Sequence, residues 1–154
     1  MLTRRAFLGA GAGLVVAGSS TVAYAGYIEP AMRLLVTRYR LTPPGWPAGR
    51  PLRIAVIADL HAGGPNITLD RVTEIVATVN ELKPDLIVDL GDHIATGRFV
   101  TETVPPPEWA AVLADLSAPL GTYVVLGNHD WWHEPRAIRS ALDSREVSDN
   151  GLHP

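Results

Sequence analysis

The sequence contains no cysteine in its 154 residues, and this absence excludes a fold held together by disulfide bonds. It neither supports nor opposes an extracytoplasmic location. Basic residues are also few, with 13 Lys and Arg against 16 Asp and Glu, so the formal net charge is −3. This balance argues against a nucleic-acid partner held by a basic patch. No glycine-rich phosphate loop follows any predicted strand, which disfavours a nucleotide-binding protein without hydrolysis.

The composition otherwise fits one globular domain behind an N-terminal leader. Hydrophobic residues make up 47% of the chain and charged residues 19%, which is enough apolar material for an ordinary core. No internal repeat is present. The pattern divides the chain into a leader over 1–25, an approach strand with a Pro/Gly linker over 26–52, and an α/β domain over 53–154.

The leader begins with two arginines and continues without charge. Residues 4–8 (RRAFL) precede a Gly/Ala-rich segment, and this order resembles a twin-arginine export signal, although Gly9 stands where such signals usually carry lysine. Residues 6–25 are just long enough to cross a bilayer as an anchor. Residues 23–25 (AYA) also suit cleavage by a signal peptidase, so anchoring and removal both stay open. We expect the twin-arginine export machinery as a partner, and an extracytoplasmic location in the periplasm or cell envelope, with or without a membrane anchor.

Four stretches have strand patterns. Residues 33–41 alternate well enough for an edge or approach strand. Three short, nearly continuous apolar runs follow over 53–59, 85–92 and 122–126, and such runs are typical of strands buried on both faces of a parallel sheet. Residues 143–154 contain no apolar run, so no further element is expected there.

Helical patterns alternate with these strands. The first helix can begin at Asn66 or Thr68, the second begins near Pro107 and Glu108, and a short third helix covers 134–142. Alternation at this spacing predicts an α/β fold with a parallel sheet, helical cover and right-handed crossovers. One apolar stripe marks the first helix: Leu69, Val72, Ile75, Val76, Val79 and Leu82.

Each of the three apolar runs ends in residues that can bind a metal. Asp59 ends the first run and His61 follows it, Asp92 ends the second, and Asn128 and His129 follow the third. Sites in open α/β sheets form outside the carboxyl ends of the strands, so these side chains should meet. Carboxylate, imidazole and amide ligands together suit Mn, Fe, Zn, Co or Ni better than calcium. Two divalent ions sharing the Asp92 carboxylate are favoured over one, because cations would neutralise carboxylates crowded in one cleft.

Three motifs, in this order behind strands, carry a family resemblance. Residues 59–61 (DLH), 91–92 (GD) and 127–130 (GNHD) resemble the motifs of the calcineurin-like metallophosphoesterase superfamily, and the match covers roughly residues 53–133. The resemblance implies a partial metallophosphoesterase sandwich, with mostly parallel buried strands flanked by helices. It further implies a hydrolase that cleaves a phosphate monoester or diester with two divalent metal ions.

The resemblance also implies a role for each motif residue. Asp59, His61 and Asp92 would bind the first metal, and Asp92 and Asn128 would bind the second. A hydroxide held between the ions would attack phosphorus in line. His129 would then act as a non-ligand acid that stabilises or protonates the leaving oxygen.

Neighbouring polar residues have less specific patterns. Asp130 is expected to orient the site rather than bind a metal. His93 could line the cleft, but a structural role is the preferred interpretation. Asp89 lies inside the second apolar run, where it should accept hydrogen bonds from nearby backbone. Arg98 is a weak candidate for contact with the substrate phosphate.

Two departures from the family pattern bear on activity and substrate. A downstream Gly-His-x-His segment, which normally completes the family's site, does not occur before Pro154, so we interpret the chain as a truncated domain. The alternative function is therefore an inactive fragment that binds metal weakly. Ala95 and Thr96 stand where protein phosphatases of the superfamily carry an Asp-Arg pair, which disfavours a protein substrate. Envelope phosphodiesters, pyrophosphate-linked lipids or sugars, and nucleotides remain candidate substrates.

Trp131 and Trp132 follow the third motif directly. Adjacent aromatic residues beside a site can stack on a base or a sugar. The preferred interpretation is that one of the two packs the loop onto the domain.

Overall fold

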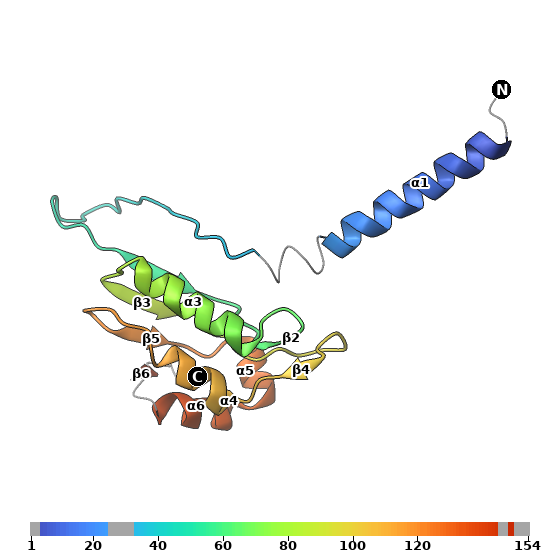
Figure 1. The fold of residues 1–154 in the computed structure, drawn as a ribbon. Coiled ribbons are helices and arrows are strands. Elements are labelled where there is room, and N and C mark those ends of the chain that lie inside the picture. The colour runs from blue at the N-terminus through green and yellow to red at the C-terminus, as the bar shows by residue number, and fades with distance from the viewer. Residues whose placement is uncertain (1–3, 25–32, 145–147, 150–154) are drawn as a thin grey trace. The chain divides into compact units, whose positions relative to one another are not determined.

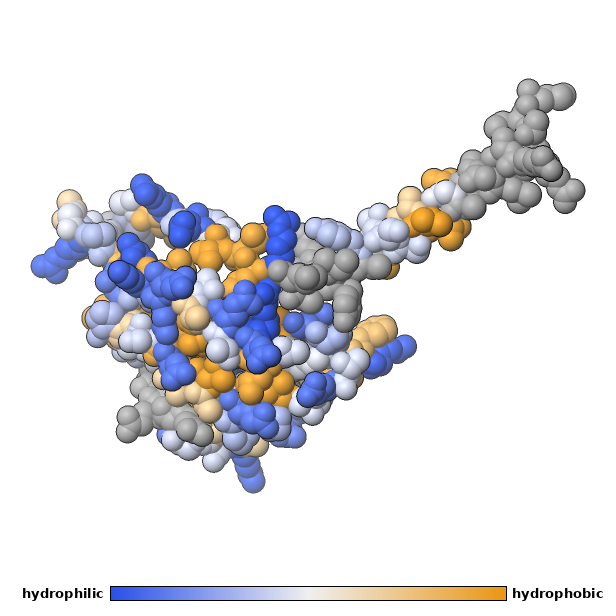
Figure 2. Space-filling model, in the orientation of Figure 1, coloured by the Kyte–Doolittle hydropathy of each residue, from blue (hydrophilic) through white to orange (hydrophobic). Residues whose placement is uncertain are grey.

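The computed structural model describes residues 4–24, 33–144 and 148–149, which belong to two compact units, 1–38 and 39–154. The first unit contains helix α1 (Arg4–Ala23), in the position predicted for the leader. Its exposed hydrophobic residues include Leu14, Val15, Val16 and Val22 (Figure 2). Within the described ranges, no helix combines the length and the apolar character that a membrane crossing requires.

The second unit is built on a four-stranded parallel sheet in the order β1-β3-β5-β6 (Figure 1). Strands β1 (Ile54–Ile57), β3 (Leu86–Asp89) and β5 (Thr122–Val124) lie within the three predicted apolar runs. Strand β6 (Ser148–Asp149) was not predicted, because its two residues have no hydrophobic pattern and are defined only by pairing with β5. The expectation of a parallel α/β sheet is confirmed, and the expectation of no element after residue 142 is wrong.

Helices cover one face of this sheet. Helix α3 (Leu69–Glu81) buries Val72, Val76 and Val79 of the predicted stripe. Helix α4 (Pro106–Leu113) places Pro in its first turn, where a missing N–H is tolerated, and buries Trp109 completely. The cover is completed by α6 (Pro135–Asp143), which is preceded by the short helix α5 (Asn128–His133).

The strands are not buried on both faces, which corrects the prediction from their continuous apolar runs. In β1, Ala55 and Ile57 are buried under the helices, whereas Ile54 is 47% and Val56 60% exposed. Tyr123 of β5 is likewise 43% exposed. The pleat therefore separates a helix-covered face from a more open face.

Residues 33–41 do not form the predicted strand. They have no regular secondary structure and are mostly exposed, because no neighbouring strand pairs with them among the described residues. A small antiparallel pair does occur elsewhere, between β2 (Gly63–Gly64) and β4 (Glu102–Thr103). This pair ties the loop after β3 to the segment that follows His61.

Candidate metal centre

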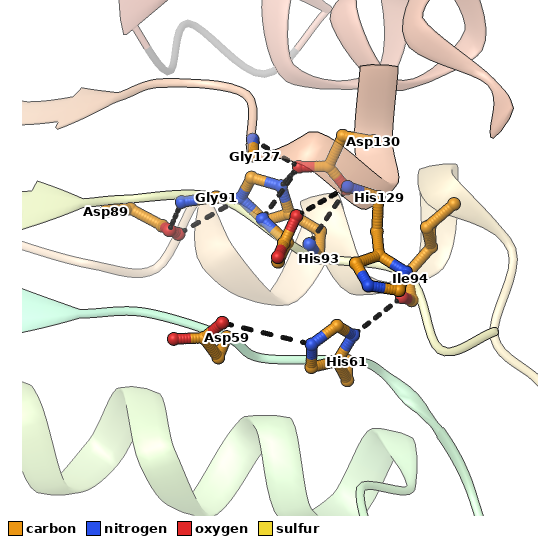
Figure 3. Close-up of polar contacts among 10 residues, drawn as sticks. Asp59, His61, Asp89, Gly91, His93, Ile94, Gly127, His129 and Asp130 are labelled. Carbon is orange, nitrogen blue, oxygen red and sulfur yellow. Dashed lines mark hydrogen bonds and ion pairs between the residues drawn. The ribbon is translucent and has the colours of Figure 1, made fainter. Parts of the chain in front are cut away.

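The loops that follow β1 and β3 run side by side at the carboxyl end of the sheet. The backbone N–H of Asp59 donates to Gly91 O at 3.0 Å, and that of His61 donates to Asp92 O at 2.8 Å. From the third segment, the backbone N–H of His129 donates to Asp92 Oδ1 at 2.7 Å. The sheet thus brings all three motifs together, as the sequence predicted (Figure 3).

His61, Asp92 and His129 form a group that could hold a metal ion. Each offers one ligand atom, and these atoms all lie within 4.8 Å of one another. The two imidazole rings meet edge to face, with 4.9 Å between their centroids. The arrangement supplies nitrogen and oxygen donors of the kind that divalent transition metals bind.

Hydrogen bonds fix which nitrogen each imidazole presents. His61 Nδ1 lies 3.0 Å from the carbonyl oxygen of Ile94, which can only accept, so this nitrogen carries the hydrogen and Nε2 keeps a free lone pair. His129 Nδ1 is hydrogen-bonded to Thr96 Oγ1 at 2.7 Å; the hydroxyl can donate or accept, so this contact engages Nδ1 and makes Nε2 the available nitrogen without fixing which of the two carries the hydrogen. A backbone carbonyl behind a histidine is the usual way in which proteins orient a metal ligand.

Asp59 and Asn128 adjoin this group. Asp59 is outside the 4.8 Å set, and its side chain is 73% exposed, but Oδ1 lies 3.9 Å from His61 Nε2. The two terminal atoms of the Asn128 amide lie 3.2 Å from Asp92 Oδ2 and 3.3 Å from His129 N. Without an ion, hydrogen bonding favours the amide nitrogen beside Asp92. The opposite orientation places the amide oxygen beside the carboxylate, where the two oxygens could share a cation. The donor set therefore fits a divalent metal.

Three of the candidate ligands have left-handed backbone conformations. The φ angles of Asp59, His61 and Asp92 are 53°, 43° and 60°. Such angles are uncommon outside glycine, and strained residues of this kind cluster at functional sites. The loops after β1 and β3 thus have the kind of backbone conformation that is typical of functional sites.

Two glycines allow the motif backbones to touch. A β-carbon on Gly91 (φ 86°) would overlap the backbone nitrogen of Gly127, and one on Gly127 would overlap Asp92 Oδ1 and the Asp92 backbone nitrogen. Gly127 has an ordinary φ of −79°, so close approach alone requires glycine there. Glycine at both positions is therefore needed for Asp92 to lie against the third motif.

Behind Asp92 lies a fully buried charged network. His93 Nδ1 is hydrogen-bonded to Asp130 Oδ2 at 2.8 Å, and its Nε2 lies 3.2 Å from Asp89 Oδ2. The ring of His93 also stacks on that of Trp109, with centroids 4.7 Å apart. Neutral histidine has a single N–H, so an imidazolium that donates to both carboxylates satisfies the network best.

Electrostatics support the charged form of His93. Burial by itself lowers the pKa of this imidazole, but the hydrogen bonds and charges of Asp130 and Asp89 outweigh it and raise the pKa to about 9. Burial would raise the pKa of Asp130, yet the hydrogen bond and charge of His93, with backbone N–H donors from Gly127 and His93, lower it. His93 is therefore protonated and Asp130 ionised near neutral pH.

Asp130 joins the second motif to the third. Its carboxylate accepts the backbone N–H groups of Asp92 and His93, each at 2.9 Å, and that of Gly127 at 3.0 Å. These contacts connect Asp130 to His93 and to the backbone of both motifs, while the orienting role expected of Asp130 stays a prediction. Asp89 accepts the backbone N–H of Gly91 at 3.0 Å, as expected, but its contact with His93 was not foreseen. A buried aspartate in an apolar run needs a partner, and this signal could have led to it.

The remaining sequence candidates occupy exposed positions. Trp131 is 40% and Trp132 71% exposed, so neither lies in the core, and the packing expected of one member of this pair is provided by Trp131 against α6. The guanidinium carbon of Arg139 lies 4.7 Å from the Trp131 ring centroid, whereas Trp132 lies against His129. Arg98 is exposed, and none of the contacts described for the site involves it. Thr96, noted in the sequence only as a departure from the family pattern, proves to contact His129.

Comparison with known proteins points to one family. Residues 52–151 match the family model described as calcineurin-like phosphoesterase. The uncharacterized metallophosphoesterase YkuE of Bacillus subtilis (strain 168) is 33% identical over 149 residues, which are 92% of this chain and 49% of YkuE. UDP-2,3-diacylglucosamine pyrophosphatase LpxG of Chlamydia trachomatis is 33% identical over 114 residues, 72% of this chain and 32% of LpxG. An uncharacterized metallophosphoesterase of Aquifex aeolicus is 31% identical over 99 residues, 64% of this chain and 36% of that protein. The chain thus spans about half the length of these relatives or less, and no solved structure gives a significant match.

Proposed function

Because the chain belongs to the calcineurin-like phosphoesterase family, we propose that it hydrolyses phosphate monoesters or diesters with two bound divalent metal ions. Family membership supports metal-dependent phosphoester hydrolysis in general. The observation that carries the proposal further is the convergence of three separate segments: the ligand atoms of His61 and Asp92 lie within 4.8 Å of each other and of His129, which is proposed below as an acid at the same site. The ions are proposed to be Mn, Fe, Zn, Co or Ni, which accept this mixture of nitrogen and oxygen donors.

In this proposal Asp59, His61 and Asp92 hold one ion, and Asp92 and Asn128 hold the other. Support for Asp92 as the shared ligand comes from its neighbours: a carboxylate oxygen lies within 4.8 Å of a His61 ring nitrogen, and Oδ2 lies 3.2 Å from a terminal atom of the Asn128 amide. When bound, such ions lower the pKa of coordinated water and neutralise phosphate oxygens.

His129 is proposed to supply the proton that the leaving oxygen needs. Its Nδ1 is engaged by Thr96 at 2.7 Å, so Nε2 is the nitrogen available to a substrate. Imidazole is the side-chain group that most often serves as a general acid in enzymes. Asp130 and His93 are proposed to hold Asp92 in place rather than to touch the substrate, because both are completely buried.

A second candidate is a chain that binds metal weakly and turns over nothing. The exposure of Asp59, at 73% of its side chain, favours this alternative, because an exposed carboxylate is less constrained than a buried ligand.

Metal analysis combined with a hydrolysis assay tests these two candidates. The purified chain would be loaded with Mn²⁺ and assayed on bis(p-nitrophenyl) phosphate and p-nitrophenyl phosphate. We expect two bound ions, turnover, and loss of both in Asp92→Asn, while Asp115→Asn, an exposed carboxylate in a turn, serves as the matched control. Weak binding with no turnover on either ester would contradict the hydrolase proposal and support the second candidate.

We also propose a natural substrate in the cell envelope or among nucleotides, and export through the twin-arginine machinery. The relative LpxG is a pyrophosphatase of UDP-2,3-diacylglucosamine, which supports a lipid- or nucleotide-linked phosphate. The basic pair Arg4-Arg5 at the start of α1 supports export. Replacing both by lysine should leave the protein in the cytoplasmic fraction; unchanged fractionation would contradict this route.

A further inference from the structure

Helix α5 (Asn128–His133) presents three aromatic rings on one face. His129, Trp132 and His133 are spaced three and four residues apart, the spacing of neighbours on a helix surface. The ring centroids of Trp132 and His133 lie 5.5 Å and 6.4 Å from that of His129. His129 also belongs to the candidate metal group with His61 and Asp92. The indole of Trp132 therefore borders the candidate metal centre.

The two adjacent tryptophans differ in what they contact. The ring of Trp131 lies against the guanidinium of Arg139, a residue of α6. Trp132 is the more exposed of the pair, at 71%, and its ring contacts the ring of His129 at the candidate metal centre. A large aromatic surface in water is stabilised when something apolar or flat covers it. A ligand at the site would be placed to cover Trp132.

We propose that Trp132 is a stacking platform for a planar aromatic group, such as a nucleobase, carried by the phosphate that binds beside His129. This inference rests on the proposed phosphoesterase function and narrows its substrate to nucleotide-type esters. The ring centroids of His129 and Trp132 are 5.5 Å apart, a separation typical of aromatic rings in contact. A base attached to a phosphate that binds beside His129 would therefore have the exposed indole within reach.

The platform would recognise a class of ligand rather than one base. Every nucleobase has a flat π face, so stacking on an aromatic side chain tolerates any base sequence. A sugar phosphate without a base would leave the indole in water and gain nothing from it. The preference for a base is consequently the property to measure.

Binding of two phosphates that differ only in the base tests the proposal. Adenosine monophosphate and ribose 5-phosphate would be titrated into the Mn²⁺-loaded full chain by calorimetry. We expect the wild type to bind the nucleotide about tenfold more tightly, in line with base–aromatic stacking. Trp132→Ala should remove this preference, Trp132→Phe should keep part of it, and the matched control Trp131→Ala should keep all of it.

The outcomes separate this inference from the proposed function. Equal binding of the two phosphates by the wild type, including absent binding of both, overturns the platform. A preference that survives in Trp132→Ala also overturns it. Retained preference for the nucleotide with no hydrolysis of any ester by the same preparation would instead contradict the phosphoesterase proposal and leave the platform standing.

Discussion

The carboxylate of Asp130 accepts a hydrogen bond from Nδ1 of His93 at 2.8 Å, and neither side chain is exposed to solvent. Asp130 lies in helix α5, whereas His93 follows β3, so this pair joins two motifs that are 37 residues apart. The same carboxylate also accepts the backbone N–H of Asp92. The position of the central candidate ligand therefore depends on a buried ion pair that does not itself face the site.

Asp130→Asn should destabilise the fold strongly. The substitution keeps the shape of the side chain but removes one of the two charges that face the buried His93 imidazolium. Breaking a buried pair in this way costs about 3–5 kcal/mol of the free energy of unfolding. Urea unfolding followed by tryptophan fluorescence measures the loss. Glu74→Gln is the control, because Glu74 is 55% exposed and pairs with Arg71 at the surface, where ion pairs contribute little. Equal unfolding of the wild type and Asp130→Asn would show that the network is not ionised.

Stability should fall as the pH rises from neutral to alkaline. The pKa of His93 is about 9 in the folded protein and 6.5 ordinarily, so the folded state holds a proton that the unfolded state has lost between these values. The contribution of His93 is thus complete below pH 6.5 and disappears as the pH passes 9, by roughly 3 kcal/mol at most. Asp89 and Asp130 are the charged groups that face the ring, and Trp109 stacks on it.

Urea unfolding at pH 6.5 and above pH 9 checks this sign. A chelator should be present, because metal binding is itself pH-dependent. In His93→Gln this alkaline loss should be absent, since glutamine does not titrate. A wild type that gains stability between the two values would contradict the charged form of His93 at neutral pH.

Gly127→Ala should weaken metal binding as well as the fold. Its φ of −79° suits alanine, but a β-carbon would overlap the Asp92 carboxylate and backbone, so the loop after β3 must move. Displacing a packed group in this way costs about 1–3 kcal/mol. Gly97→Ala is the matched control: it meets no atom within 4 Å and bears only the strain of φ 113°. Manganese affinity and urea unfolding, measured together, should show a loss of affinity only in Gly127→Ala.

Thr96→Val should show whether His129 acts as an acid or as a metal ligand. Valine has the shape of threonine but cannot hydrogen-bond His129 Nδ1, which Thr96 Oγ1 now contacts at 2.7 Å. If His129 delivers a proton, as proposed, kcat on a diester should fall about tenfold while manganese affinity stays constant. Thr73→Val, which removes a hydroxyl bond to Leu69 O on the exposed face of α3, is the control. If manganese affinity in Thr96→Val falls by the same factor as kcat, His129 is a metal ligand instead.

Sequence patterns predicted the order of strands and motifs in the domain better than they predicted which strand residues are buried. The apolar runs located β1, β3 and β5, and the order of the motifs predicted that Asp59, Asp92 and His129 lie at one edge of the sheet. The runs could not show that Ile54 and Val56 are exposed, because a hydrophobic strand has the same pattern whether one face or both are covered. The strand expected over 33–41 failed for a related reason, since alternation does not supply a pairing partner.

The sequence by itself determined the chemistry at the strand ends, because residue types and their order behind apolar runs fix which donors reach the edge of a parallel sheet. The tertiary structure alone decided how those donors are held. The contacts of Asp130 with His93, of Thr96 with His129 and of Gly127 with Asp92 join segments more than 30 residues apart. Contacts of this kind depend on distances and angles between separately folded loops, which no local pattern contains.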